Sequence, residues 1–273
     1  MNAWINGRTV ATVDHRDRGL QYGDGVFETM CVRRHAVRHL DYHLQRLFEG
    51  CARLMIEPPN EDRLRRELSE AAARRASAVL KLIVTRGVGP RGYQCSGRER
   101  CTRILTLTAL PHSAARLAGK PISVRICRMV LGTNTRLAGL KTLNRLESVL
   151  ARSEWTDPRI HEGLLRDGDD NIVCGTMSNL FVRRGKLLVT PLLDRCGVAG
   201  VMRRWVLQQA RALRLRPTQG RIGVQDLKDA EEVFMTNAVA GLMSVGEIRQ
   251  GALRIRPPMT ATAVALRDRL DEL

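Results

Sequence analysis

The amino-acid sequence predicts an α/β (α+β) fold of two domains, a smaller N-terminal domain and a larger C-terminal domain. The 273 residues are enough for two modest hydrophobic cores. Segments with a helical spacing of apolar residues alternate with short β-type segments along the chain. Between residues 111 and 120 this pattern stops, and Pro, His, Ser and Gly accumulate. We therefore place the domain boundary there, with residues 1–112 in the first domain and 113–273 in the second.

The N-terminal domain is predicted to combine a sheet with helices. Trp4-Ile5 is typical of a short strand that turns at Asn6-Gly7, a dipeptide favoured in hairpins. Apolar residues recur every three or four positions in 41–56, which indicates an amphipathic helix, and a more charged helix follows in 62–75. Segments rich in β-branched residues, or alternating Leu with Thr, predict strands over 26–32, 79–85 and 104–109.

The C-terminal domain shows the same mixture of elements. A helix is predicted to begin at Lys141 and to run to about Trp155, and another from Val201 to Leu213, directly after Gly200. Strands are predicted over 122–131, 163–166, 180–190 and 232–236. We find no internal repeat and no low-complexity linker.

The chain is strongly basic, with a formal net charge of +17 and a pI near 10.8. Such a charge can mark a nucleic-acid-binding protein. Here the arginines are spread over nearly every predicted element, without a basic tail, a zinc-finger spacing or a basic–aromatic stripe. This distribution favours a compositional bias over a nucleic-acid surface as its explanation. The positive charge can still help to attract an anionic substrate.

The cysteines and the apolar segments indicate a cytoplasmic protein. The seven cysteines are an odd number without a CxxC pair, which is typical of free thiols in a reducing compartment. The N-terminus lacks a basic segment followed by an apolar run, and no apolar stretch of transmembrane length occurs. We therefore expect a protein of the cytoplasm with no membrane partner.

Lys141 is the most informative single residue. Only five of the 45 basic residues are lysines, so arginine is the default cation of this chain. A guanidinium cannot lose its proton near neutral pH, whereas an ammonium can, and the free amine forms Schiff bases with carbonyl groups. A lysine placed after the turn Gly139-Leu140, at the start of a predicted helix, therefore invites a chemical explanation.

Four segments support such an explanation. They are 18–29, which is rich in glycine and ends in Val-Phe-Glu-Thr; 43–47; 137–147 around Lys141; and 178–203, which begins with Ser-Asn-Leu-Phe and ends with Gly-Val-Ala-Gly-Val-Met-Arg. In this order and spacing they resemble the fold-type IV pyridoxal-phosphate enzymes, which include branched-chain and D-amino-acid aminotransferases and aminodeoxychorismate lyases. The resemblance covers essentially the whole chain. It implies the two-domain fold of D-amino-acid aminotransferases with pyridoxal 5'-phosphate between the domains, and a homodimer.

Within that superfamily the lyase branch matches best. Residues 85–93 resemble the lyase loop Arg-Gly-x-Gly-x-Arg-Gly-Tyr, and residues 137–152 resemble the lyase segment around its lysine. The implied reaction converts 4-amino-4-deoxychorismate into 4-aminobenzoate and pyruvate, a step towards folate. A D-amino-acid or branched-chain aminotransferase is the main alternative. A further alternative is a basic nucleic-acid-binding protein built on an inactive enzyme scaffold.

The resemblance gives Lys141 the central role in catalysis. The lysine would bind the cofactor covalently until the amine of the substrate displaces it. The freed amine would then remove the proton from C4 of the substrate, while the cofactor ring takes up the electron density. The same lysine would protonate the methylene of the departing enolpyruvyl group, so that one residue serves as anchor, base and acid.

The phosphate of the cofactor needs hydrogen-bond donors and positive charge. A helix that begins after Gly200 offers unsatisfied backbone N–H groups and a dipole that favours an anion. The resemblance assigns the amides of Val201 and Met202 to the phosphate. It also places Arg46 on the phosphate and the turn Asn237-Ala238 nearby.

The substrate of the lyase carries two carboxylates, so guanidinium donors are expected near it. Arg91 in the Gly-rich loop is the leading candidate, with Tyr93 beside it as a shaping or hydrogen-bonding group. Arg86 and Arg145 are weaker candidates. We expect no metal site.

One position departs from the family pattern. The superfamily has a glutamate five residues before the Asn of Ser-Asn-Leu-Phe, paired with the pyridine nitrogen of the cofactor, and in this chain that position is Cys174. A neutral thiol is a weak hydrogen-bonding partner and supplies no charge. The nearest acids, Asp169 and Asp170, lie across an expected hairpin turn. The departure favours a lyase, in which aromatisation supplies driving force, over a transaminase. Impaired catalysis and an engineered substitution are the other interpretations.

Overall fold

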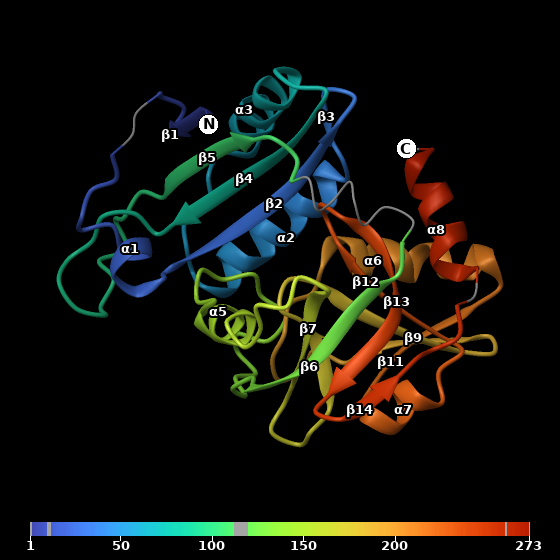
Figure 1. Cartoon of the computed structure of the whole chain (residues 1–273). Coiled ribbons are helices and arrows are strands. Elements are labelled where there is room, and N and C mark those ends of the chain that lie inside the picture. The colour runs from blue at the N-terminus through green and yellow to red at the C-terminus, as the bar shows by residue number, and fades with distance from the viewer. Residues whose placement is uncertain (1, 10–11, 112–119, 260, 273) are drawn as a thin grey trace. The chain divides into compact units, whose positions relative to one another are not determined.

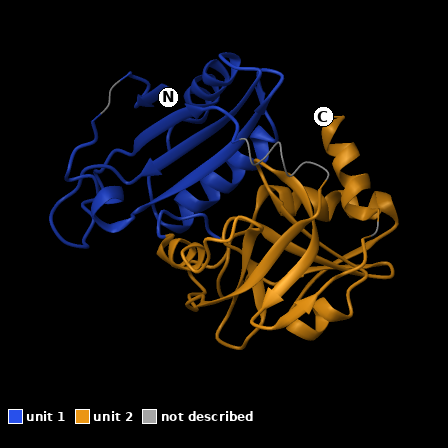
Figure 2. Ribbon diagram, viewed as in Figure 1, with its two compact units in different colours: residues 1–111, 140–144 blue, residues 112–139, 145–273 orange. Residues whose placement is uncertain are grey.

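The computed structural model describes residues 2–9, 12–111, 120–259 and 261–272 (Figure 1). The chain divides into two compact units (Figure 2). Unit 1 comprises residues 1–111 and 140–144, and unit 2 comprises residues 112–139 and 145–273. The segment Leu140–Asn144, which we assigned to the C-terminal domain from the sequence, thus groups with the N-terminal part. Most of the expected boundary region, residues 112–119, lies outside the described residues.

Unit 1 is built on an antiparallel five-stranded sheet with the strand order β1-β5-β4-β2-β3. The strands are β1 (Asn2–Ile5), β2 (Gly25–Arg33), β3 (Ala36–Val37), β4 (Ser77–Thr85) and β5 (Thr102–Thr108). The helices are α1 (Arg18–Tyr22), α2 (Leu40–Arg53) and α3 (Glu61–Ala73). The hairpin predicted at Asn6-Gly7 is confirmed, because both residues have positive φ angles and the Ile5 amide donates to the Arg8 carbonyl over 2.8 Å.

Helices α2 and α3 cover one face of this sheet (Figure 1). Helix α2 buries Leu44 and Leu47 in a core that also contains Leu80 and Leu82 of β4. The apolar spacing in the sequence therefore predicted this helix correctly. Helix α1 was not predicted, and it forms within the Gly-rich segment because the Asp17 carboxylate caps its first turn, accepting from the Gly19 amide over 2.8 Å.

Unit 2 contains a nine-stranded mixed sheet with the order β11-β10-β9-β12-β13-β6-β7-β8, and β14 pairs with β13. The strands are β6 (Ile122–Val130), β7 (Ile160–Arg166), β8 (Ile172–Gly175), β9 (Asn179–Arg184), β10 (Leu187–Pro191), β11 (Arg216–Gly220), β12 (Glu232–Asn237), β13 (Gly241–Gln250) and β14 (Leu253–Ile255). The helices are α5 (Leu146–Arg152), α6 (Val201–Gln209), α7 (Val224–Lys228), α8 (Thr262–Asp271) and the 3-10 helix η1 (Ala210–Leu213). Within the described part of the chain, no helix is both long and apolar enough to cross a membrane.

The prediction that a helix begins at Lys141 was wrong, because α5 begins only at Leu146. The backbone before it follows β2 instead. The Phe27 amide donates to the Lys141 carbonyl over 3.0 Å, and the Leu143 amide donates to the Gly25 carbonyl over 3.0 Å. Such pairing with a strand requires an extended backbone, which a helical turn at Lys141 cannot supply.

Candidate functional site

Lys141 belongs to unit 1, although the residues just before and after its segment belong to unit 2. Thr142 forms an antiparallel bridge with Val26, so β2 fixes the backbone on both sides of the lysine. The half-buried side chain of Lys141 carries its Nζ atom 4.1 Å from the centroid of the Phe27 ring. A cationic amine at that distance is attracted by the face of the ring. The structure therefore holds this amine at a defined place in unit 1.

Strand β2 and helix α2 contribute a buried cluster, formed by Glu28, His43 and Arg46, which we call the Glu28 cluster. The Glu28 carboxylate accepts from Arg46 Nε over 2.7 Å and again from the Nη2 atom of Arg46, so the pair is bidentate. The ring of His43 bonds to the same carboxylate through Nδ1 over 2.6 Å. The guanidinium of Arg46, which we expected at the phosphate, is thus held firmly by a buried acid.

The Glu28 cluster has a defined charge state. Burial would raise the pKa of Glu28, but the Arg46 charge and the hydrogen bonds from His43 and Arg46 outweigh it and bring the pKa down to about 2. Burial lowers the pKa of His43 more than the neighbouring Glu28 raises it, and the charges of Arg46 and Lys141 lower it further. At neutral pH the cluster therefore contains a carboxylate, a guanidinium and a neutral imidazole, within electrostatic reach of the Lys141 amine.

Helix α6 of unit 2 begins at Val201, directly after Gly200, where the sequence predicted a helix. Gly200 is the N-cap residue, and among the described residues no side chain caps this helix. A Cβ atom on Gly200 would lie 2.0 Å from Oδ1 of Asn179, so only glycine permits the close approach. The side chains of Val201 and Met202 are buried, and their backbone amides begin the helix. Backbone donors that no side chain caps fit a phosphate group.

Arg203 adds positive charge to the same turn, although the sequence gave no reason to assign it a role. The residue is buried, and its guanidinium donates to the Pro191 carbonyl over 2.9 Å and to Oε1 of Gln219 over 2.8 Å. Burial lowers the pKa of Arg203 to about 10, so the side chain stays cationic at neutral pH. A buried cation whose described hydrogen-bond partners are neutral makes this helix end still more favourable for an anion.

The turn Asn237-Ala238 and Asn179 lie at the same end of two neighbouring strands, β12 and β9. Strand β12 places Thr236, the residue before the turn, opposite Asn179 of β9. The side chain of Asn237 supports the turn, since its Oδ1 accepts from the amides of Val239 over 3.0 Å and of Ala240 over 2.7 Å. Unit 2 therefore brings this turn close to Asn179, the residue that packs on Gly200.

Cys174 lies in β8 and is buried. Burial raises the pKa of its thiol to about 12, so the thiol is neutral at physiological pH. Asp169 and Asp170 are exposed and form ion pairs with Arg195 and Arg166 respectively. The structure thus offers neither of these acids in place of the family glutamate, and Cys174 supplies no charge to a ring nitrogen.

Glu162 is a buried acid that the sequence did not bring to attention. It lies on β7 and accepts hydrogen bonds from the turn between β8 and β9. The signal that could have revealed it is a glutamate within a strand whose following residues are apolar. Charged residues are rarely fully buried without a specific partner.

The loop that contains Arg91 and Tyr93 belongs to unit 1, and both side chains are exposed. The Arg18 guanidinium holds this loop by donating to the carbonyl of Gly92 over 2.8 Å and of Tyr93 over 3.1 Å. The Arg86 guanidinium donates two hydrogen bonds to the Asp24 carboxylate, over 2.7 and 3.0 Å, so it is already paired with an acid. These contacts leave Arg91 the better of the two as a candidate for a substrate carboxylate. Its role stays a prediction.

Arg145, the other weaker candidate, lies in unit 2. Burial lowers the pKa of its guanidinium, while Cys174 and Glu147 raise it. Arg145 is therefore within electrostatic reach of the position where the family carries a glutamate. No group of three or more metal-binding side chains occurs in the described ranges.

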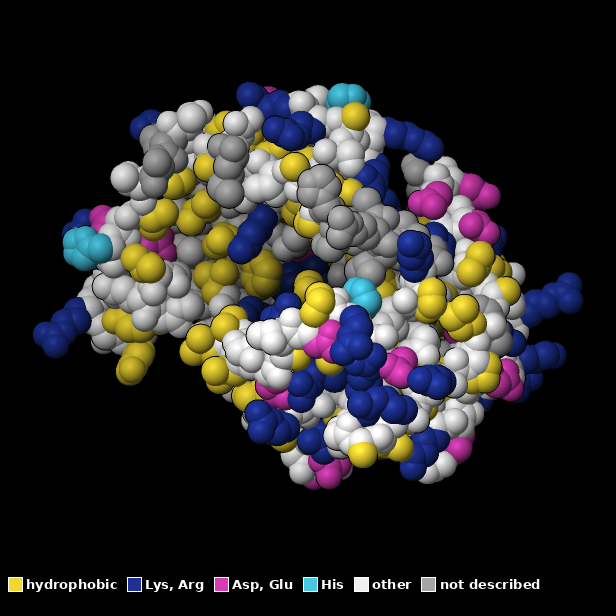
Figure 3. Space-filling view, viewed as in Figure 1, with side chains coloured by type: hydrophobic (Ala, Val, Ile, Leu, Met, Phe, Trp, Pro, Cys, Tyr) yellow, Lys and Arg dark blue, Asp and Glu magenta, His cyan; other side chains and the backbone are white. Residues whose placement is uncertain are grey.

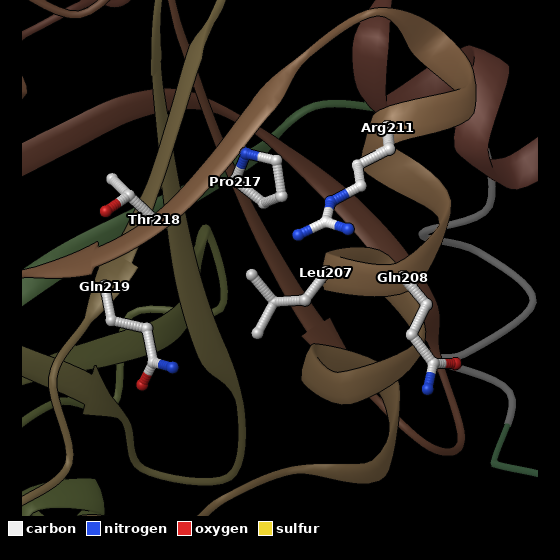
Figure 4. Close-up of a pocket in the computed structure, with 6 residues that line it drawn as sticks. All are labelled: Leu207, Gln208, Arg211, Pro217, Thr218 and Gln219. Carbon is white, nitrogen blue, oxygen red and sulfur yellow. The ribbon is translucent and has the colours of Figure 1, made fainter.

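A groove of about 590 Å³ lies on unit 2 (Figure 4). It is lined by Leu207, Gln208, Arg211, Pro217, Thr218 and Gln219. This lining contains no Asp, Glu, His, Cys or Lys, and its arginine stays protonated. The groove therefore offers no general base at neutral pH.

Comparison with known proteins gives a consistent result. A model of the amino-transferase class IV family matches residues 25–248. An aminodeoxychorismate lyase of Vibrio harveyi is 31% identical over 245 residues, which is 90% of each chain. A putative branched-chain-amino-acid aminotransferase of Methanocaldococcus jannaschii is 29% identical over 255 residues, 91% of this chain and 88% of that protein.

A solved structure matches as well. The 4-amino-4-deoxychorismate lyase of Pseudomonas aeruginosa is 40% identical, superposes with a TM-score of 0.93, and covers 99% of this chain and 98% of that one. This similarity confirms the fold that the sequence predicted.

Proposed function

The chain belongs to the amino-transferase class IV family, and we propose that it is a pyridoxal-phosphate-dependent lyase that converts 4-amino-4-deoxychorismate into 4-aminobenzoate and pyruvate. The observation that carries the proposal is the position of Lys141, whose amine lies over the Phe27 ring beside the Glu28 cluster. The similarity to two lyases, at 31% and 40% identity over nearly the whole chain, supports this choice of reaction within the family.

The cofactor, when bound, supplies the electron sink for the bond changes at the substrate. Lys141 would hold the cofactor through its amine, and this amine would be free for proton transfer once the amine of the substrate is bound. Its amine then accepts the proton from C4 of the substrate, the bond between C3 and the enolpyruvyl oxygen breaks, and the ring becomes aromatic. Lys141 returns a proton to the methylene carbon of the leaving enolpyruvate, which becomes pyruvate.

The other residues bind and orient. The backbone amides of Val201 and Met202 and the guanidinium of Arg46 hold the cofactor phosphate, with the positive charge of Arg203 in support. Glu28 keeps the Arg46 side chain in one orientation through its bidentate bonds. Arg91 binds a substrate carboxylate.

The residues fit the lysine and phosphate ends of the cofactor, but neither Cys174, Asp169 nor Asp170 offers a carboxylate for its ring nitrogen. The neutral Cys174 thiol makes the ring a weaker electron sink than a glutamate would. A lyase tolerates this better than an aminotransferase, because formation of an aromatic product drives the reaction. The departure at Cys174 therefore supports the lyase over its closest rival.

An assay without any keto acid tests the proposal. The purified protein, supplied with pyridoxal phosphate, is given 4-amino-4-deoxychorismate, and 4-aminobenzoate and pyruvate are measured together. A lyase forms them in equal amounts. Turnover only in the presence of a keto-acid acceptor would identify an aminotransferase, to which the 29% identity with the M. jannaschii protein points.

Two further outcomes concern partners. On the face drawn in Figure 3, Lys and Arg side chains are spread over both units with acids among them. If the purified protein binds no cofactor but binds DNA in a strongly salt-dependent way, a basic nucleic-acid-binding scaffold is favoured over an enzyme.

We also propose that the protein is a cytoplasmic homodimer. Light scattering tests the oligomeric state, and cell fractionation tests the location.

A further inference from the structure

The buried carboxyl group of Glu162 accepts most of its hydrogen bonds from one turn of the chain. The residue is 3% exposed, and its Oε1 atom accepts from the amides of Gly163 over 2.9 Å and of Thr176 over 3.1 Å. The Thr176 hydroxyl donates to the same oxygen. Its Oε2 atom accepts from the Met177 amide over 3.3 Å and from the Ser178 hydroxyl over 2.7 Å. Within the described parts of the chain, no Lys or Arg forms an ion pair with Glu162.

The turn that surrounds this carboxylate joins β8 to β9. Its residues, 176–178, donate four of these hydrogen bonds, so the turn is folded around Glu162. The Gly175 amide also donates to the Ser178 carbonyl over 2.7 Å, which closes the turn. A carboxylate that accepts several hydrogen bonds within one turn restricts that turn to one conformation.

Asn179 follows the turn directly and bonds to the loop before α6. Its Nδ2 atom donates to the Val198 carbonyl over 2.8 Å. Its Oδ1 atom lies where a Cβ atom of Gly200 would otherwise be. The position of the first turn of α6 therefore depends on where the turn 176–178 places Asn179.

The same loop also contacts the chain just before the lysine. The Gly139 amide donates to the Gly197 carbonyl over 3.1 Å, and the Ala199 amide donates to the Gly139 carbonyl over 2.9 Å. Gly139 precedes Lys141 by two residues. Hydrogen bonds and adjacent residues of the chain within unit 2 thus connect Glu162 to the N-terminal end of α6 and to Gly139.

We propose that Glu162 is a positioning residue that preorganises the phosphate-binding end of α6, acting through the turn 176–178 and Asn179. The proposal rests on the proposed function, because the anion in question is the cofactor phosphate. A neutral amide in place of the carboxylate would present N–H donors to the donors of the turn, and the turn would shift. The backbone amides of Val201 and Met202 would then no longer point to one place.

The test compares pyridoxal phosphate with pyridoxal, which lacks the phosphate. Binding of each is titrated by fluorescence to wild type, Glu162→Gln and the control Glu231→Gln, whose side chain is 51% exposed. We expect Glu162→Gln to weaken pyridoxal phosphate binding about 10- to 100-fold, and pyridoxal binding less than about threefold. The control leaves both affinities unchanged. A merely structural defect would weaken both ligands alike, and that result would overturn the proposal.

A second set of variants keeps the proposal testable if Glu162→Gln does not fold. Thr176→Val with Ser178→Ala removes two hydroxyl donors and leaves the carboxylate in place. The same selective loss of phosphate affinity is expected, to a smaller degree, and equal affinities for both ligands in wild type and variant would refute the role. Combining these changes with Asn179→Ala should weaken pyridoxal phosphate binding by less than the sum of the separate free-energy losses, because all three side chains act through the same turn.

Failure of the proposed function gives a result that differs from failure of the positioning role. A wild-type protein that binds neither pyridoxal phosphate nor pyridoxal would contradict the enzyme itself and leave no phosphate site to position. A wild type that binds pyridoxal phosphate normally, with Glu162→Gln unchanged, would contradict only the positioning role.

Discussion

The candidate functional residues of the two units differ in their chemistry. Unit 1 places Lys141 within electrostatic reach of His43, which belongs to the Glu28 cluster together with a carboxylate and a guanidinium. Unit 2 uses mainly backbone amides at α6 and the neutral thiol of Cys174. Two of its buried polar side chains, Glu162 and Arg203, are hydrogen-bonded to other protein groups.

The difference follows from what each part must do. A lysine that acts as anchor, base and acid changes its charge, and nearby charged groups set the free energy of that change. A phosphate keeps its charge throughout, so fixed dipoles and rigid backbone donors suffice. On this comparison, changes in unit 1 should alter catalysis and pH dependence, while changes in unit 2 should alter cofactor affinity or have little effect.

The largest effect is expected for Lys141→Ala. Loss of the amine removes both the covalent anchor and the proton carrier, so turnover should fall by at least about 10⁴-fold. The visible absorbance of the bound cofactor should vanish with it. The matched control is Lys81→Ala, because Nζ of Lys81 lies 5.4 Å from the centroid of the same Phe27 ring.

The control should retain turnover within about threefold of wild type. Absorbance spectra and steady-state rates of the two variants decide the assignment. An unchanged spectrum in Lys141→Ala, or a lost spectrum in Lys81→Ala, would place the cofactor on a different lysine.

Glu28→Gln should produce the next largest effect, this time on stability. The Arg46 side chain is 12% exposed, and the variant would leave its guanidinium without the carboxylate that binds it twice. Breaking a buried ion pair from one side typically costs about 3 kcal/mol or more of unfolding free energy. Urea unfolding measures this cost. The exposed pair of Glu61 with Arg65 supplies the control, since Glu61→Gln should cost less than about 0.5 kcal/mol.

Equal losses in Glu28→Gln and Glu61→Gln would show that the Glu28 cluster contributes no more than a surface pair.

The sequence predicted elements whose apolar pattern is set by a core. The spacing of Leu44 and Leu47 follows the buried face of α2, and the alternation in β4 follows the faces of its sheet. The four-segment resemblance also led to the correct fold. Local pattern and turn chemistry were sufficient for these features.

Features that depend on distant partners were not predictable in the same way. The extended backbone at Lys141 is dictated by β2, more than a hundred residues earlier. The buried state of Glu28 depends on Arg46 of another element, and that of Glu162 depends on donors 14 to 16 residues later. A single acidic residue in a predicted strand does not by itself show that the folded chain will supply hydrogen-bond donors to its carboxylate.

A smaller effect is expected from pH. The pKa of His43 is lower in the folded protein than its usual value of 6.5, and burial lowers the pKa of His39 to about 4. The unfolded chain therefore binds these protons more readily. Stability is full above pH 6.5 and falls as the pH drops, by up to about 1.4 kcal/mol per pH unit for one proton.

Glu28 extends the same trend to lower pH, since its pKa of about 2 lies below the usual 4.5. Urea unfolding at pH 7.5, 6.5 and 5.5 should show a steeper loss for wild type than for His43→Gln, which cannot titrate. A wild type whose stability rises on acidification, or parallel curves for both proteins, would contradict the neutral imidazole.

The smallest effect is expected for Cys174→Ala. A thiol with a pKa of about 12 supplies no charge to a ring nitrogen, so its removal should change turnover by less than about threefold. Iodoacetamide near neutral pH should leave Cys174 unmodified while the exposed Cys95 reacts, as mass spectrometry can show. The sharper variant is Cys174→Glu, which restores the carboxylate of the family pattern. An inactive wild type and an active Cys174→Glu protein would mean that the weaker electron sink has abolished the reaction, whereas turnover in both would mean that aromatisation of the product compensates for the missing charge.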